Sequence, residues 1–193
     1  MADSVDLYWL PLGAGGHFVK WNGRIYEALK ARRERRRPLA LYHSALQVHL
    51  GQETYVIEQA PEPDLTSESR GVVAEGPVGA QWAARFRVFR YEIRVWRGGN
   101  IPDVVEAVDS PRLVSDDTEV ARQVLGAAPH VPTHVWGRDE LGTGEMWNSN
   151  SIIAWILSAG GIHAEEIQPP AGGRAPGWNA GVVAAQRPAP DPT

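Results

Sequence analysis

A β-hairpin over residues 39–60 is the feature that most constrains the fold of this chain. Two runs with alternating apolar residues, "LALYHSALQVHL" and "TYVIEQA", flank the glycine-containing turn "GQE". Short alternating runs on both sides of such a turn are typical of two antiparallel strands. The hairpin therefore predicts an antiparallel sheet.

The length of the turn decides which side chains share a face of this hairpin. If Gly51 and Gln52 form a two-residue turn, Ala45 pairs with Glu58, and His43 points to the same side as Glu58. Diagonal neighbours of this kind are roughly 7–8 Å apart at Cα, a gap that long side chains can bridge. A three-residue turn would reverse the parity and place Gln59 beside His43 instead.

The stretch "MWNSNSIIAWIL" predicts a helix over 148–161, which ends at a double glycine. Asn148, Ser149 and Ser151 are all good capping residues, and capping is the commoner role of serine at a helix start. The alternative role is chemical, because the free N–H groups and partial positive charge of a helix start can stabilise an oxyanion. Ser149 is then a candidate nucleophile.

The rest of the chain completes an α+β pattern. Further strands are expected at 5–12 and 82–100, and a slip in the apolar phase of the latter indicates a β-bulge or two strands joined by a kink. Further helices are expected at 24–37, 101–108 and 115–126. Polar or Pro/Gly-rich stretches at 62–80, 127–146 and 169–181 read as loops, the last as a covering loop. We expect one domain over 1–184, with the 148–161 helix packed on an antiparallel sheet, and a disordered tail over 185–193.

Composition narrows the classes of function. A net charge of −4 argues against nucleic acid as the main partner, and the lack of cysteine excludes thiolate chemistry. The start of the chain does not read as a signal peptide, and no apolar run is long enough for a transmembrane helix, so a cytoplasmic protein is expected. The histidines make no metal motif, and no cofactor motif is present. Oligomeric state stays open.

Two segments resemble the circularly permuted branch of the papain-like superfamily, which includes NlpC-type and lecithin–retinol acyltransferase-like proteins. "YHSALQVHLGQETYVIEQ" is similar to the histidine hairpin of that group, and "WNSNSIIAWILSAGGI" is similar to its nucleophile helix. The whole chain also resembles an uncharacterised bacterial family. The resemblance implies His43 as general base, Glu58 (or Gln59) as the residue that orients it, and Ser149 in the place of the family's cysteine.

Two functions follow as hypotheses. The first is a Ser-dependent acyl hydrolase or acyltransferase, acting on an amide, ester or thioester of a small-molecule, lipid or peptide substrate. The second is a catalytically inactive domain of the same kind that binds a small ligand or a protein partner. In both, the candidate residues that line the site are Trp147, Asn148, Gln59, Arg174 and Trp178.

Overall fold

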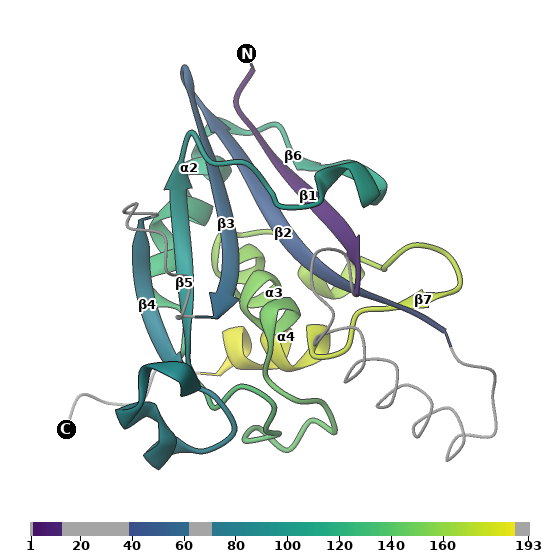
Figure 1. Cartoon of the computed structure of the whole chain (residues 1–193). Helices are drawn as coiled ribbons and strands as arrows, with labels where there is room; N and C mark the ends of the chain where they lie inside the picture. The colour runs from purple at the N-terminus through teal and green to yellow at the C-terminus, as the bar shows by residue number, and fades with distance from the viewer. Residues whose placement is uncertain (1, 13–38, 62–70, 188–193) are drawn as a thin grey trace.

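A computed structural model describes residues 2–12, 39–61 and 71–187, and these form a mixed sheet-and-helix domain (Figure 1). The described residues contain the strands β1 (Ser4–Pro11), β2 (Ala40–Leu50), β3 (Glu53–Pro61), β4 (Val72–Pro77), β5 (Arg90–Arg97), β6 (Val108–Ser115) and β7 (Gly173–Arg174). They also contain the helices α2 (Thr118–Ala127), α3 (Ser149–Ala159) and α4 (Trp178–Gln186). Short 3₁₀ turns are η1 (Gln81–Arg85), η2 (Arg87–Phe89), η3 (Val104–Glu106), η4 (Ala128–His130) and η5 (Ala164–Glu166).

The sheet runs in the order β4-β5-β3-β2-β1-β6, with antiparallel pairing between all neighbours. The short strand β7 adds a parallel contact to the first two residues of β2. The predicted α+β class with an antiparallel sheet is confirmed.

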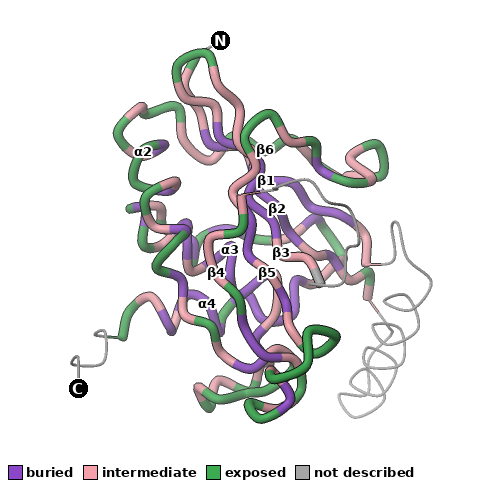
Figure 2. Tube along the Cα trace, turned by 60° about the vertical axis from the view of Figure 1, so that its left-hand side comes forward, coloured by how far each residue is buried: buried purple, intermediate pink, exposed green. Residues whose placement is uncertain are grey.

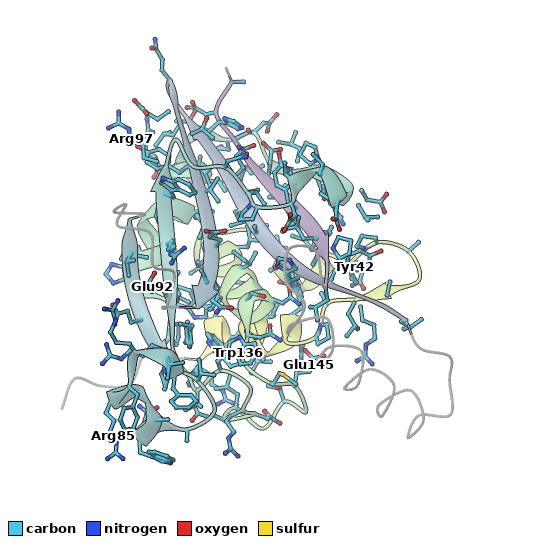
Figure 3. All side chains as sticks on the ribbon, viewed as in Figure 1. Tyr42, Arg85, Glu92, Arg97, Trp136 and Glu145 are labelled. Carbon is cyan, nitrogen blue, oxygen red and sulfur yellow. The ribbon has the colours of Figure 1, made fainter. Side chains whose placement is uncertain are left out.

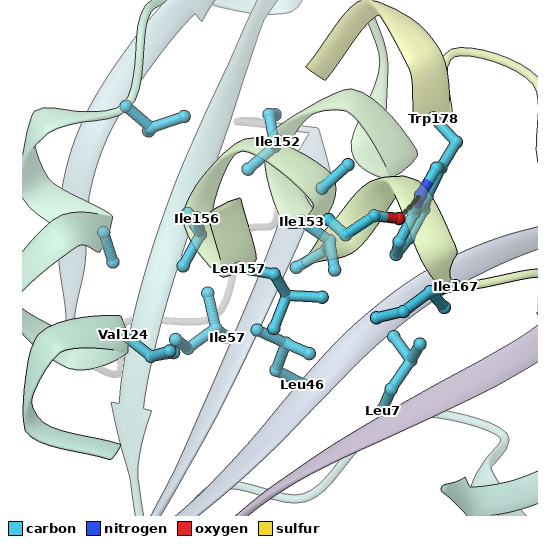
Figure 4. Packing of buried hydrophobic residues seen from close by; sticks show 14 of the residues in the cluster. Leu7, Leu46, Ile57, Val124, Ile152, Ile153, Ile156, Leu157, Ile167 and Trp178 are labelled. Atoms are coloured by element: carbon cyan, nitrogen blue, oxygen red, sulfur yellow. Dashed lines mark hydrogen bonds between the residues drawn. The ribbon is translucent and has the colours of Figure 1, made fainter. Parts of the chain in front are cut away.

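The two faces of the sheet are covered by different elements. Leu7, Leu46 and Ile57 point to the face on which α3 packs, where they meet Ile153 and Leu157 in the main core (Figure 4). The opposite face carries a smaller apolar cluster, made by Tyr8, Leu10, Ala45, Val56 and Ile101, and the η3 segment packs on it. Burial is accordingly greatest along the central strands and α3 (Figure 2).

The hairpin has the two-residue turn of the first alternative. Leu50 pairs with Glu53, so partners sum to 103, and Gly51 adopts a φ of 65° that suits glycine in this turn. The parity argument is therefore confirmed: His43 and Glu58 point to the same face of the sheet.

Helices α3 and α4 pack closely because Gly181 has no side chain. A β-carbon at Gly181 would lie 2.0 Å from the carbonyl oxygen of Ser151, far inside van der Waals contact. The close approach lets α4 cover α3, and the ring of Trp178 at the start of α4 packs at a tilt of 47° against Trp9 of β1, with ring centroids 5.0 Å apart. The C-terminal helix thus belongs to the core of the domain.

Only the second half of the predicted strand over 82–100 is a strand in the structure. Residues 81–89 form η1 and η2, and β5 begins at Arg90. The last pairs of β5 with its two neighbours are Pro61 with Tyr91 and Pro77 with Arg90. Before them, the N–H groups of Phe86 and Phe89 donate to the carbonyls of Ala83 and Phe86 within the segment, so 3₁₀ turns replace the strand although the apolar alternation continues.

Other expected boundaries also need correction. The expected 62–80 loop contains β4, and the expected 101–108 helix is reduced to η3 before β6 starts. Asp103 precedes η3 with a left-handed φ of 54°, which interrupts helical geometry. The expected 169–181 loop holds β7 and the start of α4, and α4 runs to Gln186, into the expected tail. The expected 24–37 helix lies outside the described residues.

Candidate functional site

The start of α3 is held by a complete capping arrangement. Asn148 is the N-cap, and its side-chain oxygen accepts hydrogen bonds from the backbone N–H groups of Asn150 (2.9 Å) and Ser151 (3.4 Å). In return, the Ser151 hydroxyl accepts the N–H of Asn148 at 3.1 Å, which completes a capping box. The capping interpretation of this stretch is confirmed for Asn148 and Ser151, so two of its polar residues have structural roles.

Asn150 joins α3 to two distant segments. Its side-chain amide donates to the backbone carbonyls of Tyr42 and Pro176, both at 2.9 Å, and its carbonyl accepts the Ser44 hydroxyl at 2.8 Å. Asn150 and Ser44 are buried, so these bonds are shielded from water. The residue that sequence reasoning passed over is therefore the centre of the polar network.

Ser149 stands outside this network. Its side chain is partly exposed, and within the described residues its hydroxyl makes no hydrogen bond. We expect Ser149→Ala to change the free energy of unfolding by less than about 0.5 kcal/mol, because no cap or buried partner is lost. Urea denaturation at neutral pH measures this. A loss near the roughly 1 kcal/mol typical of a removed cap would contradict it.

His43 points away from α3. Its neighbours Tyr42 and Ser44 face α3: Tyr42 belongs to the main core, and Ser44 bonds Asn150. Because side chains alternate along a strand, His43 lies on the opposite face, where its partner Leu10 belongs to the smaller cluster. The expected approach of His43 to Ser149 is thus corrected: the sheet lies between the two side chains.

The environment of His43 favours the neutral imidazole. Burial lowers the pKa of His43 from 6.5 to about 4, and the carboxylate of Asp103 opposes this shift only in part. A base with such a low pKa holds a proton poorly at neutral pH, which is unfavourable for general acid–base work.

Glu58 shares the face of His43 but lies in a cluster of charges. Its carboxylate is 3.9 Å from a guanidinium nitrogen of Arg94, which also forms an ion pair with Glu92 at 2.7 Å. Gln59 pairs with Ile93 on β5 and faces the α3 side. The parity of the hairpin thus separates the two candidates for the orienting residue, and only Glu58 lies on the face of His43.

The candidate lining residues are mostly structural. Trp147 is almost fully buried, with its ring edge-on to His134 at 4.8 Å. The Trp178 indole N–H donates to the carbonyl of Ala164 at 2.9 Å. Arg174 lies in β7, paired with Leu41, so its loop does dock on the sheet. Both tryptophans therefore serve the core.

A groove lies elsewhere, beside the outer edge of β6. It has a volume of about 430 Å³ and is bounded by β6, the first turn of α2 and the segment 161–167. Leu113 and Val114 from β6 and Ile162 and Ile167 opposite supply its apolar side chains, and the polar ones are Arg112, Ser115, His163 and Glu166. Leu113 is 57% exposed. The sequence gives little signal for this groove, because β6 contains Pro111 and lacks the regular apolar alternation of a strand.

Two kinds of site are not found among the described residues. No cluster of three histidine or acidic side chains has the arrangement of a metal site there. In the same residues, no helix is long and apolar enough to cross a bilayer.

Comparison with known proteins adds no relative. No protein-family model, curated protein or solved structure matches this chain.

Proposed function

We propose that this chain is a non-catalytic binding domain that takes an extended peptide against the outer edge of β6. The observation that carries the proposal is the 430 Å³ groove that runs beside this edge, with a leucine largely exposed in it. In the described part of the chain β6 is the last strand of the sheet on that side, so its outer backbone groups are available for pairing.

The groove suits one class of peptide. Pro111 has no N–H and Asp109 has a left-handed φ of 47°, so regular pairing is restricted to the stretch 112–115. An added strand there would direct alternate side chains toward Val114, Ile162 and Ile167. Glu166 lines the groove and its sequence neighbour Glu165 is exposed, so the two acids favour basic residues next to the apolar one. The cation that lines the groove, Arg112, donates to the backbone carbonyl of Gln168 at 2.9 Å.

Acyl transfer at Ser149 has less support. That chemistry rests on the resemblance and needs His43 within hydrogen-bond reach of the serine hydroxyl. The alternation along β2 and the bond from Ser44 to Asn150 argue against such an approach. A serine without a base stays protonated and is a poor nucleophile.

Selection from a random peptide library followed by fluorescence polarisation tests the proposal. We expect enriched peptides with an apolar residue between basic ones, and we expect Leu113→Ser to weaken the binding of these peptides at least about tenfold. The matched control is Val72→Ser on β4, which changes an exposed apolar residue on the opposite edge of the sheet. The peptide affinity of this control should equal that of the wild type.

A fluorophosphonate probe separates the two functions. We expect no labelling of Ser149 in the wild type. Labelling that is lost in His43→Ala would overturn the non-catalytic proposal. Equal peptide affinity of Leu113→Ser and the wild type would overturn the assignment of the groove.

A further inference from the structure

Four exposed apolar side chains gather in one short segment, residues 81–90, here called the aromatic tip. Trp82, Phe86, Val88 and Phe89 are 68%, 47%, 63% and 44% exposed. Single exposed apolar residues need no explanation, but a cluster of large ones in one segment marks an interaction surface. The tip projects from the foot of β5, away from α3 and from β6 (Figure 1).

The tip is also cationic. Arg85 and Arg87 are exposed between the aromatic residues, and 81–90 contains no acidic residue although the whole chain carries a net charge of −4. Exposed Arg138 is held beside the start of the tip, because its side chain donates to the carbonyl of Gly79 at 2.8 Å. A positive patch on an acidic protein is matched by an anionic partner.

The arginine between the rings is already placed for such a partner. The guanidinium carbon of Arg85 lies 5.4 Å from the ring centre of Trp82 and 4.7 Å from that of Phe86 (Figure 3). Stacking uses the flat face of the group, and its N–H donors in the plane can still bind phosphate oxygens.

Hydrogen bonds within the tip satisfy part of its backbone. The N–H groups of Ala83, Phe86 and Phe89 donate to carbonyls three residues earlier, at 2.9–3.0 Å. Arg90 anchors the end of the tip to the body through Glu75 at 3.4 Å. Turns of this kind can enter an apolar medium at lower cost than an open loop, in which each free N–H would lose its water.

We propose that the aromatic tip inserts into the interfacial region of an anionic phospholipid bilayer. Tryptophan and phenylalanine are favoured at the level of the headgroups, and flanking arginines bind lipid phosphates. A protruding, convex segment fits a deformable surface better than a flat protein partner, which would leave the sides of the tip uncovered. This binding is independent of the groove beside β6.

Vesicle flotation with the full chain tests this inference. We expect the protein to float with vesicles of phosphatidylcholine that contain about 30% phosphatidylglycerol, and to bind pure phosphatidylcholine at least about tenfold more weakly. The double change Trp82→Ser with Phe86→Ser should reduce partitioning at least about tenfold. Arg85→Gln with Arg87→Gln should reduce it by a similar factor, and this effect should shrink at high salt.

Matched controls come from exposed residues elsewhere. Val105→Ser removes an almost fully exposed apolar side chain, and Arg122→Gln removes an exposed arginine of α2. Both should partition as the wild type does, and all variants should keep its Tm. No flotation, or equal flotation with neutral and anionic vesicles, would overturn the proposal. The proposal would also be overturned if the tip variants left flotation unchanged and instead abolished a concentration-dependent dimer or the binding of single-stranded RNA.

Discussion

Replacing Asn150 by alanine is expected to lower the free energy of unfolding by about 3–4 kcal/mol, the largest effect of any single change at the start of α3. Three hydrogen bonds are lost together, to Tyr42, Pro176 and Ser44. The Ser44 hydroxyl and the Tyr42 carbonyl lose a partner away from water, and each such loss costs roughly 1–3 kcal/mol. Urea denaturation of the two proteins at neutral pH measures the difference.

Ser149→Ala is the matched control, since it removes a polar side chain one position earlier on the same turn. A catalytic role of this helix start predicts the opposite order of effects: Ser149→Ala would abolish activity, and Asn150→Ala would have little effect. If Asn150→Ala lost less than about 1 kcal/mol, the buried network would not hold the three segments together.

The second large effect is a pH dependence that His43 contributes to stability. The pKa of His43 is about 4 in the folded chain and near 6.5 when the group is in water. Between these values the unfolded chain binds a proton that the folded chain does not, so stability falls as the pH is lowered. The loss begins below about pH 6.5, is complete near pH 4, and amounts to about 2 kcal/mol between pH 7.5 and pH 5.

His43→Gln should remove this contribution, because glutamine does not titrate. The measurement compares wild type and variant by urea denaturation at both pH values. Between pH 7.5 and pH 5 the free energy of unfolding of the variant should fall by about 2 kcal/mol less than that of the wild type. His163→Gln is the contrasting control: exposed His163 donates a hydrogen bond to the Glu165 carboxylate, which raises the pKa of His163, so its contribution has the opposite sign. An identical pH dependence in wild type and His43→Gln would show that His43 is not shielded from water.

Strong local signals were enough to predict the hairpin and helix α3. The glycine turn located the hairpin and left two registers, of which the structure has the one that pairs Leu50 with Glu53. The polar cap residues before an apolar run placed the start of α3. Edge strands β4 and β6 were missed because edge strands bear weaker apolar patterns. The segment before Arg90 alternates like a strand, but its N–H groups bond within the segment as 3₁₀ turns, which the alternation of apolar residues does not reveal.

The site was harder to predict than the fold. Parity placed His43 and Glu58 on one face, but the position of α3 relative to that face was taken from the resemblance. The sequence did hold a signal: Tyr42, Leu46 and Val48 make the more apolar side of β2, against His43, Gln47 and His49. A helix as apolar as α3 packs on the apolar side, and this leaves His43 on the other.

The order of strands sets how the chain must come together. The backbone N–H of Trp9 in β1 bonds the Ser110 hydroxyl 101 positions later, and Ser44 bonds Asn150 106 positions later. Contacts between residues so far apart close large loops, which slows folding. During synthesis the pairing edges and apolar faces of the early strands therefore stay exposed until the last third of the chain has left the ribosome.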